Sequence, residues 1–263
     1  MEITVITPSF NSERFIEQTM QSVALQRSDS LSVEHLIIDG GSKDSTAKIV
    51  EQFAHSDTRF ISERDNGPAD AINKGFALAK GKYISWLNSD DFYMPGALKR
   101  AVEVLEKKSS KAFCFGHCPI VDENGREIRK RITSFKEFWY PLSCRPLIRT
   151  LNYISQPAMI IRRAALEKAG PLRTDLKAAW DYDLTLRLWR YGGAVRVQPP
   201  ALASFRWTPQ SISGSNYKLQ FTEELDCAIS DAGKFAPTAV IHRFVAWGIV
   251  FCYDKMSSTE SEK

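Results

Sequence analysis

The sequence predicts an α/β fold in which helices cover a mostly parallel sheet. Strand-like and helix-like segments alternate through the first ninety residues, with short connections between them. The chain has 263 residues, of which 43% are hydrophobic and 25% charged, so it is long enough for one large domain or two small ones. No internal repeat or low-complexity stretch interrupts the alternation.

Local signals mark the elements of the first half. An apolar segment that stops at Pro8 predicts the first strand, and Asn11 or Ser12 is suited to cap the helix after it. Ser42 is expected to cap the second helix, and Pro68 to lie in the first turn of the third. The expected order is strand 3–7, helix 16–24, strand 36–38, helix 42–53, strand 60–61, helix 68–81, strand 83–87 and a helix from residue 95 that carries an apolar stripe.

The second half is less regular. Residues 122–125, Asp-Glu-Asn-Gly, form a hairpin-turn signal, and basic residues outnumber acids from Arg126 to Arg149. Regular patterns then return, and the chain reads as helical from Asn216 onward. We expect strand 158–161, helix 163–170, helix 181–191, strands 194–197 and 202–207 that complete the sheet, and a frayed polar tail at 257–263. A loose boundary is placed near Ser215.

Charge, hydropathy and cysteine content limit the class of protein. The formal net charge of +4 is too small and too well mixed to require a nucleic-acid partner. The longest apolar run, 244–253, is far shorter than the roughly 20 residues of a membrane-spanning helix, and no signal-peptide pattern is present. Five cysteines are an odd number, which is typical of reduced thiols. A cytoplasmic protein, free or at the inner face of the cell membrane, is expected.

Several nucleotide and hydrolase motifs are absent from the sequence. There is no Gly-x-x-x-x-Gly-Lys-Ser/Thr phosphate loop, no Gly-x-Gly-x-x-Gly dinucleotide turn and no Gly-x-Ser-x-Gly nucleophile elbow. Cys114 and Cys118 lack a second ligand pair at zinc spacing, which disfavours a structural zinc. Carboxylate chemistry around Asp39, Asp90 and Asp181 remains.

Two of these acids follow predicted strands. Asp39 ends the strand 36–38, and Asp90 follows the strand 83–87. Open α/β sheets bind ligands outside the carboxyl ends of their strands, so the two side chains can converge on one crevice. The alternative is structural: Asp39 would stabilise the Gly40-Gly41 turn, and Asp90 or Asp91 would cap a helix.

Five motifs resemble those of the family 2 glycosyltransferases with the GT-A fold, in the same order and at suitable spacing. The resemblance covers roughly residues 1–215. The motifs are Ile-Thr-Pro-Ser-Phe-Asn at 6–11, Ile-Asp-Gly-Gly-Ser-Lys-Asp-Ser-Thr at 38–46, Asp-Ala-Ile-Asn-Lys-Gly at 70–75, Leu-Asn-Ser-Asp-Asp at 87–91, and Trp-Asp-Tyr-Asp-Leu at 180–184 followed by Arg187.

The resemblance implies a Rossmann-like α/β/α sandwich with a C-terminal helical extension. Residues 1–115 would bind a nucleoside-diphosphate sugar, residues 116–215 would bind the acceptor, and residues 216–263 would form the extension. Asp39 would bind the nucleobase or ribose, beside a wall formed by Thr7, Pro8 and Ser9.

The resemblance also implies an inverting, metal-assisted transfer. Asp90 would bind Mg²⁺ or Mn²⁺, with Asn88 and Ser89 beside it near the donor, and one carboxylate suffices because a diphosphate adds its own oxygens. Asp181 would be the base that takes the acceptor's proton. Without the resemblance, helix capping by Asp181 would be favoured, and Asp183 is its less suitable neighbour.

Four further positions are less clearly assigned. Lys74 and Arg187 are equally suited to a diphosphate and to ion pairs within the fold. Thr208 stands where many relatives have a histidine that contacts metal or phosphate, which puts metal dependence in question. Arg206 is a candidate to supply the missing positive charge.

The acceptor is expected to be a glycan or a polyprenyl-linked glycan, in cell-surface polysaccharide or glycoconjugate assembly. The basic stretch 126–149 either meets an acceptor phosphate or anionic lipid headgroups, or is a solvated loop. The apolar run 244–253 either packs on its own domain or on a second subunit, as in a homodimer, or lies at a membrane interface. A UDP-sugar donor is favoured. A non-catalytic sugar-nucleotide scaffold is the main alternative function, and a nucleotidyltransferase is a weaker one.

Overall fold

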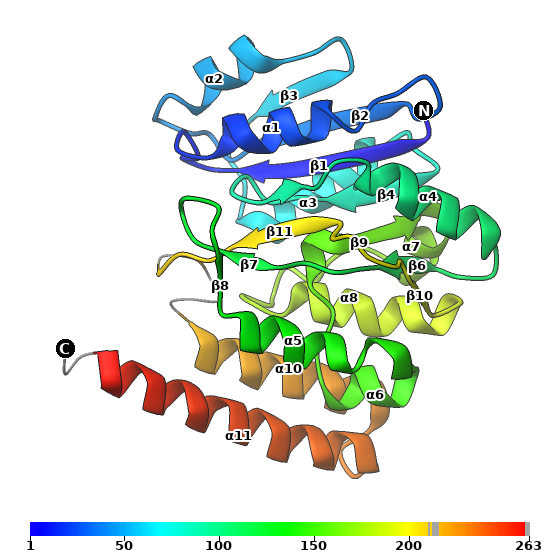
Figure 1. The fold of residues 1–263 in the computed structure, drawn as a ribbon, viewed down its shortest axis with the longest axis vertical. Coiled ribbons are helices and arrows are strands. Elements are labelled where there is room, and N and C mark those ends of the chain that lie inside the picture. The colour runs from blue at the N-terminus through cyan, green and yellow to red at the C-terminus, as the bar shows by residue number, and fades with distance from the viewer. Residues whose placement is uncertain (210, 212–215, 261–263) are drawn as a thin grey trace.

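The computed structural model describes residues 1–209, 211 and 216–260, with side chains as far as residue 250 (Figure 1). A mostly parallel sheet crosses the middle of the molecule, and two long helices lie at the end of the molecule away from β1 and β2. The predicted α/β class is confirmed.

The central sheet has seven strands in the order β10-β6-β9-β4-β1-β2-β3. Neighbouring strands run parallel except around β9, which is antiparallel to both β4 and β6. The strands are β1 (Ile3–Ser9), β2 (Val33–Asp39), β3 (Thr58–Ser62), β4 (Tyr83–Trp86), β6 (Phe113–Phe115), β9 (Met159–Arg162) and β10 (Ala194–Arg196). The order reverses between β1 and β4, so the carboxyl ends of these two strands border a natural ligand crevice.

A second sheet of four short strands lies beside the first, in the order β5-β11-β7-β8. The strands are β5 (Phe92–Tyr93), β11 (Ala203–Arg206), β7 (Ile120–Val121) and β8 (Glu127–Ile128). The predicted hairpin is confirmed, because β7 and β8 are antiparallel across the turn at Gly125, whose φ is 77°. The prediction that residues 202–207 complete the central sheet is wrong, since β11 pairs with β5 and β7 instead.

Helices cover both faces of the central sheet. Val5 belongs to the core that includes α4, whereas Ile6 belongs to the core that includes α3 and α8, as the alternation of side chains along a strand requires. The helices are α1 (Ile16–Ala24), α2 (Thr46–Phe53), α3 (Pro68–Leu78), α4 (Ala97–Lys107), α5 (Lys130–Phe138), α6 (Arg145–Thr150), α7 (Arg163–Ala169), α8 (Trp180–Leu188), α10 (Tyr217–Ala232) and α11 (Pro237–Glu260). The expected three-layer sandwich is therefore present.

Two predicted helix caps are wrong, because both polar segments are used in loop contacts. α1 begins after Phe15, and the Oδ1 atom of Asn11 instead accepts a hydrogen bond from the Lys43 amide at 2.9 Å. α2 begins after Ser45, and the hydroxyl of Ser42 donates to Asp39. Pro68 lies in the first turn of α3, as predicted. These contacts join the loops after β1 and β2 at the carboxyl edge of the sheet.

α10 and α11 pack on α6 and α8 at the end of the molecule away from β1 and β2 (Figure 1). Val245 and Ile249 of α11 pack against the core, while Phe244 and Trp247 are about 70% exposed. Within the described residues, no helix has the length and apolar character needed to cross a membrane. The expected frayed tail is helical from 257 as far as Glu260, and 261–263 lie outside the described residues.

Candidate active site

A cavity of about 820 Å³ opens at the carboxyl ends of β1 and β4. Part of its lining comes from the loops after β1, β2, β3 and β4 and the start of α3. Most of the remainder comes from α5, residues 152–157, α8, β11 and α10. The lining includes Pro8, Ser9, Phe10, Ser12, Gly40, Arg64, Asp65, Trp86, Asn88, Ser89, Asp90, Lys136, Asn152, Gln156, Trp180, Asp181, Phe205, Ser211 and Gln220. Four residues predicted to bind the sugar donor (Pro8, Ser9, Asn88 and Ser89), the predicted metal ligand Asp90 and the predicted base Asp181 therefore line one cavity.

The loop after β4 carries the predicted metal ligand. Asn88, Ser89 and Asp90 all line the cavity, and the hydroxyls of Ser89 and Ser12 lie 2.7 Å apart. Burial raises the pKa of Asp90 by more than its backbone hydrogen bond and the charge of Arg206 lower it. Among the described residues, no other residue donates a hydrogen bond to its side-chain oxygens.

The oxygen atoms around Asp90 suit a hard cation that a bound diphosphate would also coordinate. Asp91 is fully buried, and its two oxygens accept hydrogen bonds from the Arg206 amide and from Asn88. Asp91 is therefore engaged in the fold, and of these two neighbouring acids only Asp90 lines the cavity. No group of three or more His, Cys, Asp or Glu side chains suited to a metal occurs in the described part of the chain. Mg²⁺ or Mn²⁺ would need oxygens from a diphosphate and water as well.

Arg206 supports the Asp90 loop from behind. Its side chain is buried, and Nε donates to the main-chain carbonyl of Asp90 at 2.8 Å. Its other nitrogens bind the carbonyls of Asp122 and Glu123 and the side chain of Gln18. The idea that Arg206 supplies positive charge directly to the ligand is not supported, because the side chain does not line the cavity. Thr208, two residues on, is buried and accepts a hydrogen bond from the Ser211 amide.

Asp39 organises the turn after β2. Its carboxylate accepts hydrogen bonds from the amides of Gly41 and Ser42 at 3.1 and 2.9 Å, and from the hydroxyls of Ser42 and Ser62. Burial opposes its charge, but these hydrogen bonds outweigh burial and lower the pKa of Asp39. Asp39 is 1% exposed and is absent from the cavity lining, whereas Gly40 is part of it. These contacts are the turn-stabilising role weighed for Asp39, and its binding of a nucleobase or ribose stays a prediction.

Two other predicted donor residues lie away from the cavity. Thr7 is fully buried, and its hydroxyl lies 2.9 Å from Nε2 of His35. Lys74 pairs with Glu63 at 2.9 Å and does not reach the cavity. Of the two roles weighed for Lys74, the ion pair within the fold is the observed one.

Asp181 approaches the cavity from the first turn of α8. The helix begins at Trp180 after Ala179, so Asp181 does not cap it, and its Oδ1 accepts a hydrogen bond from the Tyr182 amide at 2.7 Å. Burial raises the pKa of Asp181, while the Tyr182 amide and Lys136 oppose that shift. A carboxylate in such a position is a stronger base than one in water.

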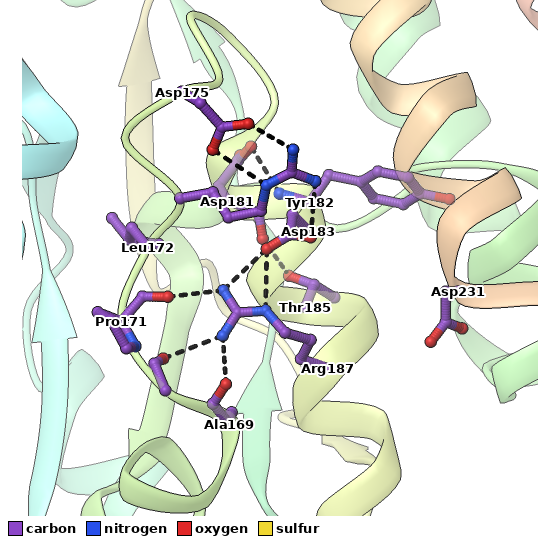
Figure 2. A network of polar contacts seen from close by, with 12 residues as sticks. Ala169, Pro171, Leu172, Asp175, Asp181, Tyr182, Asp183, Thr185, Arg187 and Asp231 are labelled. Carbon is purple, nitrogen blue, oxygen red and sulfur yellow. Dashed lines mark hydrogen bonds and ion pairs between the residues drawn. The ribbon is translucent and has the colours of Figure 1, made fainter.

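Asp183 and Arg187 form a separate network on the same helix (Figure 2). Arg187 pairs with Asp183 at 2.8 Å and donates to the main-chain carbonyls of Ala169, Gly170 and Pro171. Neither residue lines the cavity. Asp183 is outside the cavity lining, as its two-residue offset from Asp181 predicts. Of the two roles weighed for Arg187, the ion pair within the fold is observed, and its hydrogen bonds to main-chain carbonyls join α8 to the end of α7.

Some basic side chains of the stretch 126–149 make contacts within the fold, and one lines the cavity. Arg145 and Arg149 pair with Asp231 of α10 at 3.3 and 2.6 Å, and the guanidinium of Arg129 lies over the ring of Trp207. Lys136 lines the cavity near Asp181. This stretch is consequently neither a free loop nor wholly a ligand surface.

Sequence reasoning missed several cavity residues. Arg64 and Asp65 follow the short β3 strand, so the rule for carboxyl ends of strands was a usable signal for them. Asn152, Gln156 and Gln220 belong to irregular or distant segments, and only tertiary contacts bring them to the cavity. Gln156 is held by a hydrogen bond from its Nε2 to the carbonyl of Trp86 at 2.7 Å.

Comparison with known proteins gives one family. The sequence profile described as "Glycosyl transferase family 2" matches residues 4–170. TuaG of Bacillus subtilis strain 168, named as a candidate teichuronic acid biosynthesis glycosyltransferase, is 28% identical over 220 residues, which cover 82% of this chain and 83% of TuaG. An uncharacterized glycosyltransferase of Rickettsia bellii is 27% identical over 195 residues, 72% of this chain. The chain spans only 27% of the length of that relative.

Solved structures share the fold. S. aureus TarS 1–349 in complex with UDP-GlcNAc superimposes with a TM-score of 0.69 over 90% of this chain and 68% of the other, at 21% identity. The mannosyltransferase PcManGT of Pyrobaculum calidifontis, in complex with GDP-Man and Mn²⁺, gives a TM-score of 0.69 over 94% of this chain and 69% of the other, at 19% identity. The α/β fold is thus GT-A-like. Because the family profile matches well over half of the chain, the chain belongs to glycosyl transferase family 2.

Proposed function

We propose that the chain is an inverting glycosyltransferase that moves a sugar from a nucleoside-diphosphate sugar to a hydroxyl of a glycan or lipid-linked glycan. The observation that carries the proposal is that Asp90, at the end of β4, and Asp181, on α8, line one cavity. A carboxylate suited to a cation and a carboxylate suited to a base are the two groups that such a displacement requires.

The donor is proposed to occupy the part of the cavity lined by Pro8, Ser9, Arg64 and Asp65, with its diphosphate near Asp90. A UDP-sugar is favoured, which the UDP-GlcNAc complex of TarS supports by analogy of fold. Mg²⁺ or Mn²⁺ bound at Asp90 would neutralise charge on the departing diphosphate. The complex of PcManGT with GDP-Man and Mn²⁺ supports a divalent cation alongside the donor in the same way.

Asp181 is proposed to take the proton from the acceptor hydroxyl as that oxygen attacks the anomeric carbon. The C–O bond to the acceptor forms while the bond to the nucleoside diphosphate breaks, so one displacement inverts the anomeric centre. The raised pKa of Asp181 suits it to this role, because burial increases the proton affinity of the carboxylate. The similarity to TuaG supports a setting in cell-surface polysaccharide assembly.

The test is release of UDP from UDP-sugars by the purified chain, with Mn²⁺ and with EDTA. Wild type is expected to release UDP slowly to water, and Asp181→Asn to lower that rate by at least about a hundredfold, the scale of general-base catalysis. Asp29→Asn is the matched control, because Asp29 is an exposed acid far from Asp181 in the sequence. This variant should release UDP at the wild-type rate. Nucleotide binding without turnover in wild type would favour the sugar-nucleotide scaffold. An Asp181→Asn rate equal to that of wild type would overturn the assignment of Asp181 as the base.

A further inference from the structure

Glu224 of α10 is a buried carboxyl group beside the cavity. Its side chain is 3% exposed, and its Oε1 atom accepts hydrogen bonds from Nδ2 of Asn152 at 3.1 Å and from Nε2 of Gln220 at 3.0 Å. The other oxygen, Oε2, accepts no hydrogen bond within the part of the chain that the structure describes. Burial of a carboxyl group costs folding free energy unless hydrogen bonds offset it, and Asn152 and Gln220 supply such hydrogen bonds here.

The two amides bound to Glu224 both line the cavity that contains Asp181. Each uses one N–H group to bind Oε1, so the rest of each amide, a carbonyl oxygen and a second N–H, is oriented by the same carboxyl group. No other residue of the described ranges binds these remaining groups. The side-chain amides of Asn152 and Gln220 therefore offer hydrogen-bond donors and acceptors side by side at the cavity wall.

The electrostatic setting places this cluster close to the predicted base. Burial is the main cause that raises the pKa of Glu224, and the nearby Asp181 carboxylate adds to it. The hydrogen bonds from Gln220 and Asn152 act in the opposite direction, and the resulting pKa is about 7. Lys136 acts on both carboxyl groups and also lines the cavity. Trp180, next to Asp181, adds an aromatic surface to the same lining, and aromatic surfaces suit the apolar face of a pyranose ring.

We propose that Asn152, Gln220 and Glu224 form the acceptor subsite, in which the two amides bind neighbouring hydroxyls of the acceptor sugar while Glu224 holds both amides in place. The proposal rests on the proposed function, because it assigns the sugar that Asp181 would deprotonate. It also gives α10 a role in the reaction, although α10 lies beyond the residues 4–170 that match the family profile.

The test measures binding of four simple sugars, the methyl glycosides of glucose, galactose, N-acetylglucosamine and glucuronic acid. Saturation-transfer NMR detects each glycoside with the protein in UDP and Mg²⁺, and titration calorimetry measures UDP affinity separately. The variants are Glu224→Gln, which keeps the shape but turns an acceptor into a donor, and Gln220→Ala, which removes one amide. Asp226→Asn is the matched control, because it also removes one carboxylate from α10 but on its exposed face.

Wild type and Asp226→Asn are expected to bind at least one glycoside, and each subsite variant to bind it at least about tenfold more weakly, the loss expected when a polar contact to a sugar hydroxyl is removed. UDP affinity should stay within about twofold in all four proteins. The proposal is overturned if wild type binds none of the glycosides, if the variants bind them as wild type does, or if UDP affinity falls in parallel. The protein could also bind a glycoside in a Glu224-dependent way but bind no nucleotide. That result would contradict the proposed function and support the acceptor subsite.

Discussion

Arg206 donates from Nε to the main-chain carbonyl of Asp90 at 2.8 Å, and its own amide donates to Oδ1 of Asp91 at 2.8 Å. One residue at the end of β11 thus fixes both acids of the loop after β4. The second sheet, which lies outside the parallel sheet, thereby acts as the support of the predicted metal site. Arg206 binds the Asp91 carboxylate and the main-chain carbonyl of Asp90 on the side away from the cavity, and this leaves the Asp90 side chain in the cavity lining.

Replacing Arg206 by methionine should therefore weaken both the fold and nucleotide binding. The half-buried carbonyls of Asp90, Asp122 and Glu123 would lose their donors, at a cost of about 2–4 kcal/mol of unfolding free energy. Urea denaturation measures the stability, and calorimetric titration with UDP and Mn²⁺ measures the binding.

Arg100→Met provides the comparison for that variant. Arg100 also binds main-chain carbonyls, those of Gln198, Pro200 and Ala201, but it is absent from the cavity lining. It should lose stability and keep its nucleotide affinity. Equal losses of affinity in the two variants would show that Arg206 acts only through overall stability.

Asp39→Asn should destabilise the protein in a way that depends on pH. The hydrogen bonds to Asp39 lower its pKa in the folded state, so its carboxylate contributes stability above the unfolded value of about 3.9, and that contribution is lost as the pH falls through the folded value. We expect a loss of about 2 kcal/mol at pH 7. Urea denaturation of wild type and variant at pH 7 and at the lowest pH that keeps both folded measures it, and a difference that does not shrink on acidification would contradict this account.

Arg187→Met should lower stability and leave nucleotide affinity unchanged. The variant loses the ion pair with Asp183 and the ties to the carbonyls after α7, all of which lie outside the cavity lining (Figure 2). The expected cost is about 1–3 kcal/mol. Thermal denaturation with and without UDP separates the two effects. A variant that folds as well as wild type but no longer binds UDP would restore the diphosphate role suggested by the motif.

Glu224 should make the protein less stable as the pH rises. Its folded pKa of about 7 lies above the ordinary 4.5, so the folded state holds an extra proton between these values, and stability falls across that window as the proton is lost. The change is at most about 3 kcal/mol. Glu224→Gln should flatten this part of the stability profile measured by urea denaturation from pH 5 to pH 8, whereas Asp226→Asn should not.

The sequence was sufficient to predict the architecture and two of the three acids in the cavity lining, Asp90 and Asp181. Apolar segments followed by polar ones mark β1, β2 and β4, and parallel strands bring such ends to one edge, which correctly grouped Pro8, Asn88 and Asp90. The side-chain direction of an acid is not encoded in this pattern. Asp39 and Asp90 both follow strands, yet the hydroxyls of Ser42 and Ser62 draw Asp39 into a turn.

The partners that polar side chains find in the folded chain explain the other differences. Lys74 and Arg187 are cations in motif-like segments, but Glu63 and Asp183 lie near enough to pair with them. Asn152 and Gln220 reach the cavity only because α10 packs on α8 and α6, a contact between segments that no local pattern predicts. Tertiary packing therefore decides which polar residues face a ligand.

The most direct test of the account is a calorimetric titration of UDP into wild type and Asp90→Asn, each with Mn²⁺ and with EDTA. The account predicts that wild type binds UDP at least about tenfold more tightly with Mn²⁺, and that Asp90→Asn binds it weakly and equally in both conditions, because Asp90 is the carboxylate presented to the cavity. Asp29→Asn should behave as wild type. UDP affinity that ignores both the metal and Asp90 would contradict the assignment of Asp90 as the ligand of a donor-bound cation.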